Sequence, residues 1–187
     1  MFGIRAQLAS DLITQRSQRA LFEDVGTATF DPTRQYRYTL TRCWDASGPR
    51  IMWLLCNPST ADENVLDPTL KRCYKWSLDL GYGSFEVTNM FAYRSTDPRG
   101  LRSVEDPVGP ENDEAILGAC GRASMVVLGW GDVASVLGQK FDQREQQLTY
   151  MLWHHHVTTY ALAVTGRTRR PRHPLYLRSS CRPTRWP

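Results

Sequence analysis

The sequence predicts an α/β fold whose central sheet is largely parallel and carries helices on both faces. From residue 50 onward, short apolar runs alternate with stretches of helical period, and this alternation is typical of βαβ units. The runs at 50–56 (RIMWLLC) and 124–129 (SMVVLG) are continuously apolar, as strands buried on both faces should be. Distinctive polar residues follow these strands, where ligands of parallel sheets bind.

The N-terminal third predicts a helix followed by two strands. Residues 3–22 place Ile4, Leu8, Leu12 and Ile13 on one side, so we expect residues 1–30 to be an N-terminal helical segment. Residues 35–44 alternate and are rich in Tyr and Thr, which favours a strand. The turn chemistry of 45–49 (DASGP) predicts that strands 35–44 and 50–56 form an antiparallel pair.

The remaining elements follow from helix signals and apolar runs. Asp67-Pro68 is typical of a helix start, and Gly81 is placed to end that helix. We expect one domain over 1–187, with an irregular basic tail at 178–187. The other expected elements are strands at 84–88, 124–129 and 158–164 and helices at 111–120 and 132–152.

Composition excludes several classes of protein. With 187 residues and 41% hydrophobic side chains, the chain is long enough to bury a core without disulfide staples. No run approaches the roughly 18 apolar residues of a transmembrane helix, and the charged N-terminal stretch does not resemble a secretory signal. The five cysteines are odd in number and widely spaced, so we expect reduced thiols and a cytoplasmic protein without a membrane partner.

Charge is distributed unevenly along the chain. Residues 165–187 hold seven Arg and no acid, which leaves a net charge of −3 for the rest of the chain. An Arg-rich strip on a mildly acidic domain suits bidentate phosphate contacts, and Arg169, Arg170 and Arg172 are the candidates. A solvated basic tail without a partner is the alternative.

Four loops at the expected carboxyl ends of the strands carry the candidate site. They are residues 57–62, 89–94, 129–132 and 165–176. Since the carboxyl ends of parallel strands meet at one edge of a sheet, we expect these loops to converge on a single cleft.

Four side chains in these loops are candidates for chemistry. Pro58 stiffens Asn57, whose amide can orient a water or a hydroxyl, and Asp62 can accept a proton. Asn89 offers a donor and an acceptor to a nucleobase edge. His173 lies in an Arg-rich loop that should lower its pKa, and a neutral imidazole suits donation to an anion. An Asx-Pro turn, a sheet-capping amide and a structural His are the respective alternatives.

Further residues of the loops are candidates for binding. Arg94 can hold a phosphate or carboxylate, and Tyr93, Trp130 and Tyr176 can stack on a base or belong to the core or rim. Residues His154–His156 are consecutive, so they do not form a chelating pair, and we expect no metal and no cofactor. Phosphate-loop, dinucleotide-binding, zincin and hydrolase-elbow motifs are absent.

Five motifs resemble an uncharacterised domain family of bacteria and their phages, catalogued as a domain of unknown function. The resemblance covers roughly residues 35–177 and implies no reaction. The motifs are LxNPSTAD (55–62), DPT (67–69), TNMFAYRSTDP (88–98), DPVGPEND (106–113) and RHPLYL (172–177).

A second resemblance is to the uracil-DNA glycosylase superfamily, and it implies a three-layer sandwich and the removal of a flipped-out base. Asn57-Pro58 is similar to its catalytic Asn-Pro loop, Asn89 to its base-recognising Asn, and His173-Pro174 to its His-Pro loop. The resemblance implies a DNA glycosylase-like hydrolase that acts on a modified base. In this interpretation Ser59 belongs to the substrate loop, and Leu175 or Tyr176 wedges into the vacated stack.

Three alternatives stay open from the sequence. A nucleotide-processing enzyme would hold Mg²⁺ on the loop acids Asp62, Asp67, Asp106 and Asp113. A nucleic-acid-binding module would use the same surface without catalysis, and an interaction protein would bind neither DNA nor a ligand in the cleft. DNA or a nucleotide is the expected partner, and a monomer is the favoured state.

Overall fold

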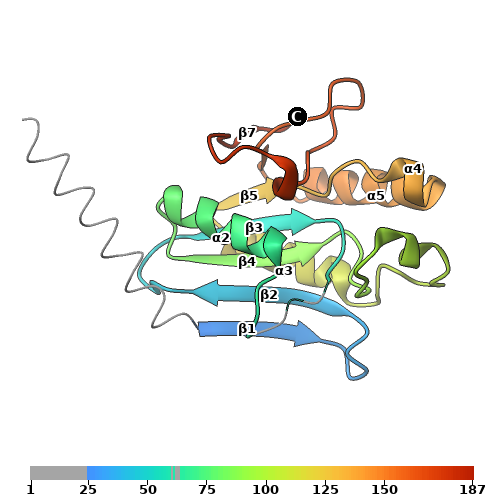
Figure 1. Ribbon diagram of the computed structural model, residues 1–187, viewed down its shortest axis with the longest axis horizontal. Helices are drawn as coiled ribbons and strands as arrows, with labels where there is room; N and C mark the ends of the chain where they lie inside the picture. The colour runs from blue at the N-terminus through green and yellow to red at the C-terminus, as the bar shows by residue number, and fades with distance from the viewer. Residues whose placement is uncertain (1–24, 60, 62–63) are drawn as a thin grey trace, which may run out of the picture.

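A mixed seven-stranded sheet forms the centre of the computed structural model, which describes residues 25–59, 61 and 64–187 (Figure 1). The strands are β1 (Val25–Phe30), β2 (Arg37–Cys43), β3 (Arg50–Leu55), β4 (Ser84–Asn89), β5 (Met125–Leu128), β6 (Thr159–Ala161) and β7 (Thr184–Arg185). The α-helices of the described residues are α2 (Pro68–Asp79), α3 (Asn112–Arg122), α4 (Ala134–Leu137) and α5 (Gln139–His154). Two 3₁₀ turns, η1 (Pro98–Arg102) and η2 (Pro174–Tyr176), complete the elements.

The strand order is β1-β2-β4-β3-β5-β6-β7. Only β4, β3, β5 and β6 pair in parallel, while β1 with β2, β2 with β4 and β6 with β7 are antiparallel. The α/β class is therefore confirmed, but the sheet is mixed rather than largely parallel.

The expected antiparallel pair of β2 and β3 is wrong, because β4 lies between them. The turn after β2 packs against the residue that precedes β4: the amides of Trp44 and Asp45 both donate to the carbonyl of Gly83. β3 is buried at nearly every position and so takes the centre of the sheet, where it is flanked by β4 and β5.

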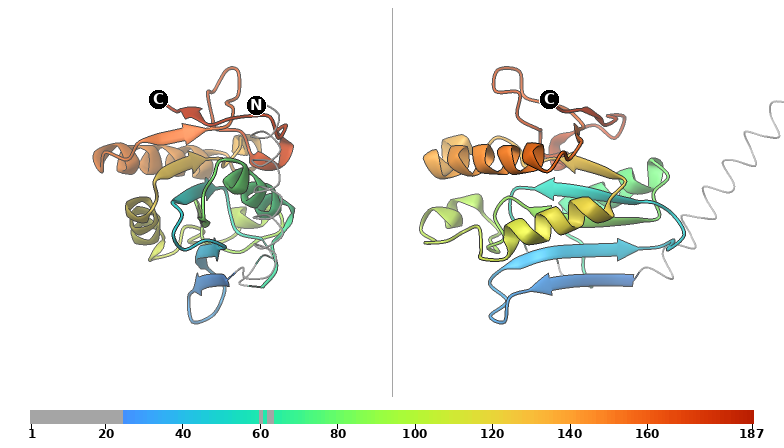
Figure 2. Two further views of the ribbon diagram at one scale, coloured as in Figure 1. Left: turned by 90° about the vertical axis from the view of Figure 1, so that its left-hand side faces the viewer. Right: turned by 180° about the vertical axis from the view of Figure 1, so that it is seen from behind.

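Helices cover both faces of the sheet. α2 buries Leu70, Cys73 and Trp76 against one face, together with side chains of the C-terminal segment. α3, α4 and α5 pack on the opposite face, as the right-hand view of Figure 2 shows for α3 and α5. The two faces therefore have separate apolar cores, with β3 contributing to both.

The start of α2 agrees with the sequence-based expectation. The Asp67 carboxylate accepts a hydrogen bond from the amide of Leu70 at 2.9 Å, and Pro68 occupies the first helical turn. Beyond the helix, Gly81 adopts a φ of +83°, which glycine tolerates without a steric penalty. Local capping chemistry thus fixes both ends of the helix that borders the site.

The two ends of the chain differ from expectation. Residues 25–30 form strand β1 rather than part of a helical segment, and residues 1–24 lie outside the described residues. The basic tail is not irregular throughout, because Thr184–Arg185 pair with β6 as strand β7. Trp186 reinforces this pairing: its backbone amide donates to the carbonyl of Thr159 and its indole packs against Trp130.

Candidate functional site

A cavity of about 350 Å³ lies at the carboxyl ends of the parallel strands. From β3 the chain passes through α2 to β4, which pairs with one edge of β3. From β4 it passes through α3 to β5, which pairs with the other edge of β3. The direction of the crossovers therefore reverses between β3 and β5, and this is the topological switch point of the sheet. Residues from all four expected loop regions line the cavity. The lining residues are Arg37, Leu55, Cys56, Asn57, Ser59, Asp67–Leu70, Asn89, Ser95, Thr96, Pro98, Trp130, Gly131, Val133, His173, Leu175 and Tyr176.

Asn57 lies two residues after the end of β3, and its amide orientation is fixed by the neighbouring loop. Its Nδ2 donates to the carbonyl of Ser95 at 2.7 Å and to that of Pro58 at 3.1 Å. Ser95 in turn donates its own amide to the Pro58 carbonyl at 2.9 Å, which joins the loops after β3 and β4. Asn57 Oδ1 accepts no hydrogen bond from any described residue, so it presents a free acceptor at the cavity.

Asn89 ends β4 and is only 1% exposed. Arg37, on β2, donates from Nη2 to Asn89 Oδ1 at 3.4 Å and from Nη1 to the carbonyl of Ala61 at 2.7 Å. Asn112, on α3, holds the backbone of the same strand end by donating to the carbonyl of Asn89 at 2.9 Å. Asn89 Nδ2 makes no hydrogen bond within the described part of the chain and therefore faces the cavity as a donor.

His173 supplies a third polar group. Its Nδ1 accepts a hydrogen bond from the amide of Leu175 at 3.4 Å, which places the proton of the neutral ring on Nε2. Burial lowers the pKa of His173, and the nearby carboxylate of Asp67 raises it in part. The direction matches the expectation from sequence, but burial rather than the surrounding arginines is the cause.

Gly129, which follows β5, and Arg72 of α2 position the turn that carries His173. A Cβ on Gly129 would lie 2.9 Å from Cδ of Pro174, so only glycine allows this approach. From the other side, Arg72 donates from Nε to the carbonyl of Pro174 at 3.1 Å and from Nη2 to the carbonyl of Leu177. The turn is therefore clamped between α2 and the end of β5.

The mouth of the cavity carries apolar and hydroxyl side chains. Tyr176 is 75% exposed and packs against His173 with ring centroids 5.8 Å apart, while Leu175 is half-buried beside it. Ser59, in the loop after β3, also lines the cavity, whereas the preceding Pro58 is buried. The proposed base Asp62 falls outside the described residues.

Tyr93 and Arg94 point away from the cavity. The Tyr93 ring meets Tyr36 edge-on at 5.6 Å, and Arg94 donates to the carbonyl of Arg34 and lies over the ring of Phe30. The chain after β4 runs back along the end of β2 before it returns. Ser95, Thr96 and Pro98 consequently line the cavity in place of the two expected residues.

Trp130 and Arg170 have structural environments that differ from their expected roles. Trp130 lines the cavity, but its indole is buried in the core beside α5 and donates to Glu145 Oε1 at 3.0 Å. Arg170 forms ion pairs with Asp132, Asp142 and Glu145 at 2.6 to 2.8 Å. Three carboxylates already occupy its guanidinium, whereas Arg169 and Arg172 are exposed.

The acids and thiols of the described residues do not suggest another catalytic group. Asp67 caps α2, Asp106 caps the turn at Val108 and Gly109, and Asp113 pairs with Arg144, so these acids serve separate structures. Among the described residues, no group of three His, Cys, Asp or Glu side chains could hold a metal ion. Burial raises the pKa of Cys56 to about 12, so this cavity-lining thiol is a poor nucleophile near neutral pH.

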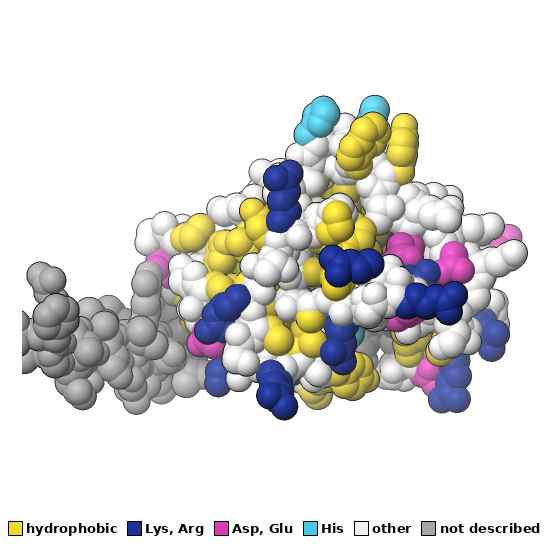
Figure 3. Space-filling view, turned by 90° about the horizontal axis from the view of Figure 1, so that it is seen from above, with side chains coloured by type: hydrophobic (Ala, Val, Ile, Leu, Met, Phe, Trp, Pro, Cys, Tyr) yellow, Lys and Arg dark blue, Asp and Glu magenta, His cyan; other side chains and the backbone are white. Residues whose placement is uncertain are grey.

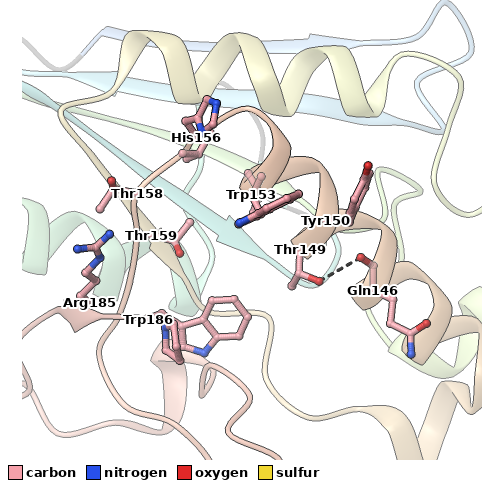
Figure 4. Close-up of a pocket in the computed structure, with 12 residues that line it drawn as sticks. Gln146, Thr149, Tyr150, Trp153, His156, Thr158, Thr159, Arg185 and Trp186 are labelled. Carbon is pink, nitrogen blue, oxygen red and sulfur yellow. Dashed lines mark hydrogen bonds between the residues drawn. The ribbon is translucent and has the colours of Figure 1, made fainter.

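A second cavity, of about 800 Å³, lies between α5 and the β6–β7 edge (Figure 4). Tyr150 and Trp153 on α5 border it and are 62% and 71% exposed. Arg185 and Trp186 of the C-terminal segment line the other side, and Thr149 of α5 and Thr159 of β6 also line the cavity. This second cavity is larger than the first, but Asn57, Asn89 and His173 do not line it.

Comparison with known proteins gives one result. The family model described as "Protein of unknown function (DUF1643)" matches residues 37–175, a span that includes Arg37, Asn57, Asn89 and His173. Neither the curated proteins nor the solved structures give a significant match. In the described part of the chain, no helix has the length and apolar character required to cross a membrane.

Proposed function

This chain belongs to the DUF1643 family, and we propose that it hydrolyses the N-glycosidic bond of a flipped-out, modified base in DNA. One observation carries the proposal: Asn57, Asn89 and His173 line one cavity, and hydrogen bonds fix the orientation of each. The cavity thereby offers an acceptor, a donor from a buried amide and a donor from a neutral imidazole. These are the groups required to hold a water, a base edge and a developing anion.

Hydrolysis needs a water on the sugar carbon and stabilisation of the leaving base. Asn57 Oδ1 accepts from the attacking water, whose oxygen bonds to the anomeric carbon as the bond to the base nitrogen breaks. The bonding electrons leave with the base, and His173 Nε2–H donates to its developing oxyanion. The departing base finally takes up the proton that the water releases.

Base selection and extrusion use the rest of the cavity. Asn89 Nδ2 donates to a carbonyl on the base edge, and Arg37 keeps the amide in that orientation. Tyr176 and Leu175 stand at the mouth, where an apolar side chain can fill the gap left in the stack. Exposed Arg169 and Arg172 are suited to flanking phosphates, and Asp62 stays a candidate base.

The non-catalytic alternative is a nucleic-acid-binding module that uses the same cavity to hold an unpaired base. The fixed neutral imidazole favours catalysis over binding alone, because the Nε2–H of a ring that lines the cavity can donate to a base that becomes charged as it leaves. The magnesium alternative loses support because Asp67, Asp106 and Asp113 serve three separate structures.

A panel of oligonucleotides with modified bases, incubated with EDTA and then cleaved with alkali at abasic sites, tests the proposal. We expect abasic product from at least one base with the wild-type chain, and a loss of about 100-fold or more with Asn57→Ala. Gln146→Ala, which removes an amide from the second cavity, should cleave like the wild type. Bound DNA without product from any base would favour the non-catalytic module, and full cleavage by Asn57→Ala would refute the assignment.

A further inference from the structure

Four exposed cations lie on α2 and on the segment that follows η2. Lys71 and Lys75 project from α2, and Arg178 and Arg182 belong to the segment after the His173 turn. We call these four residues the α2 basic surface. Figure 3 views the molecule from above and shows separate Lys and Arg side chains around hydrophobic ones, with Asp and Glu side chains also present.

Hydrogen bonds hold the two segments together. The Trp76 indole donates to the carbonyl of Cys181 at 3.3 Å, and Arg72 donates to the carbonyls of Pro174 and Leu177. A hollow of about 270 Å³ lies between them, lined by Lys71, Arg72, Lys75, Trp76, Asp79 and Ser179. The cations are therefore carried by a fixed scaffold rather than by independent loops.

Neighbouring acids do not neutralise these charges. None of the four cations forms an ion pair with another described residue, and Arg182 donates only to the carbonyls of Ser179 and Cys181. Arg72 also donates to carbonyl oxygens and so adds a further positive charge. Asp79 in the lining of the hollow and Asp67 at the start of α2 are the acids of this helix, so five cations stand beside two carboxylates and the net charge stays positive.

The spacing and position of the lysines fit a strand of nucleic acid. Lys71 and Lys75 are four residues apart, so they share one helix face and stand about 6 Å apart along its axis. This separation is close to two nucleotide steps of about 3.4 Å along one strand of a duplex. The first turn of α2 lines the cavity, so a strand whose base enters the cavity passes this helix.

We infer that the α2 basic surface binds the phosphodiester backbone of the DNA strand that flanks the extruded base. The inference rests on the proposed function in one respect, namely that the bound strand is the one whose base enters the cavity. Phosphate binding itself does not require catalysis. A single phosphate would leave most of these cations unused, whereas a chain of phosphates can occupy both segments.

Fluorescence anisotropy of a labelled DNA duplex, titrated with the full chain at several salt concentrations, tests the inference. Lys71→Glu/Lys75→Glu should weaken binding by about tenfold or more at low salt, and should reduce the slope of log K against log salt by about 2. Asp79→Asn should tighten binding, because it removes the acid from the hollow. Arg102→Gln is the control, since exposed Arg102 lies on η1, whose Leu101 packs on the opposite face of the sheet.

Several outcomes separate the inference from the proposed function. Wild-type affinity and salt slope in Lys71→Glu/Lys75→Glu, or an equal loss in Arg102→Gln, would overturn the inference. Binding to vesicles of phosphatidylserine and phosphatidylcholine without binding to the duplex would overturn it as well. Lysine-dependent DNA binding without abasic product from any base would instead support the inference and remove the proposed function.

Discussion

The two cavities of this protein differ in how their polar groups are held. At the carboxyl ends of the strands, each key side chain is oriented by hydrogen bonds at one of its polar atoms and keeps another polar atom for a ligand. In the larger cavity, Tyr150 and Trp153 are mostly exposed on the surface of α5. Prearranged polar groups, rather than volume, therefore distinguish the candidate catalytic site from the larger cavity.

The largest expected effect on stability concerns the approach of the His173 turn to β5. Gly129→Ala places a Cβ about 2.9 Å from Pro174 Cδ, and relieving this contact should cost about 1–3 kcal/mol in the free energy of unfolding. Gly121→Ala on α3 is the matched control, because nothing lies within 4 Å of its Cβ and alanine favours a helix. Urea denaturation should show opposite signs for the two variants, and equal stabilities would contradict the close packing.

The next effect concerns the cap of the helix that borders the cavity. Asp67→Ala removes the acceptor for the Leu70 amide and should destabilise the protein by about 1 kcal/mol. Glu111→Ala is the control, since Glu111 precedes α3 without a side-chain capping bond, and it should change stability by less than about 0.5 kcal/mol. Thermal unfolding of both variants provides the measurement, and a similar loss in both would rule out a special role for the cap.

A smaller effect is expected on the pH dependence of stability. Burial holds the pKa of His173 below the ordinary 6.5, so the unfolded chain takes up a proton before the folded one. The neutral His173 ring therefore contributes fully to the free energy of unfolding above about pH 6.5, and this contribution is lost as the pH falls toward the pKa of the folded state. Urea unfolding between pH 7.5 and pH 5 should show a weaker decline for His173→Gln than for the wild type. An unchanged decline would contradict the buried neutral imidazole.

The smallest effect belongs to the second cavity. Trp153→Ala removes a side chain that is 71% exposed, so stability should change by no more than about 0.5 kcal/mol. Cleavage in the abasic-site assay should equal that of the wild type. A variant that binds DNA but no longer cleaves it would move the active site to the larger cavity.

Local signals predicted the elements that position the site. Asp67-Pro68 marked the start of α2, the apolar run at 50–56 marked a central strand, and the amides of Asn57 and Asn89 were expected at the ends of their strands. These features depend on capping, periodicity and burial within a few residues of one another.

Long-range pairing explains what the sequence did not predict. The position of β4 between β2 and β3 depends on contacts of Gly83 with the turn at 45–49, and no local pattern encodes such contacts. The same placement brings Arg37 of β2 against Asn89 of β4, so the residue that orients the amide was missed. The ion pairs of Arg170 were not foreseen either, because its three carboxylate partners lie 25 to 38 residues away in the chain.

Single-turnover cleavage by His173→Ala, compared with His154→Ala, is the decisive measurement of whether His173 donates to the leaving base. Removal of a donor aimed at the leaving base should cost roughly 3 kcal/mol, which is a loss of about 100-fold or more in rate. His154 lies at the end of α5 beside Tyr150, so its substitution should leave the rate unchanged. Equal rates for the two variants on a base that the wild type removes would contradict the account.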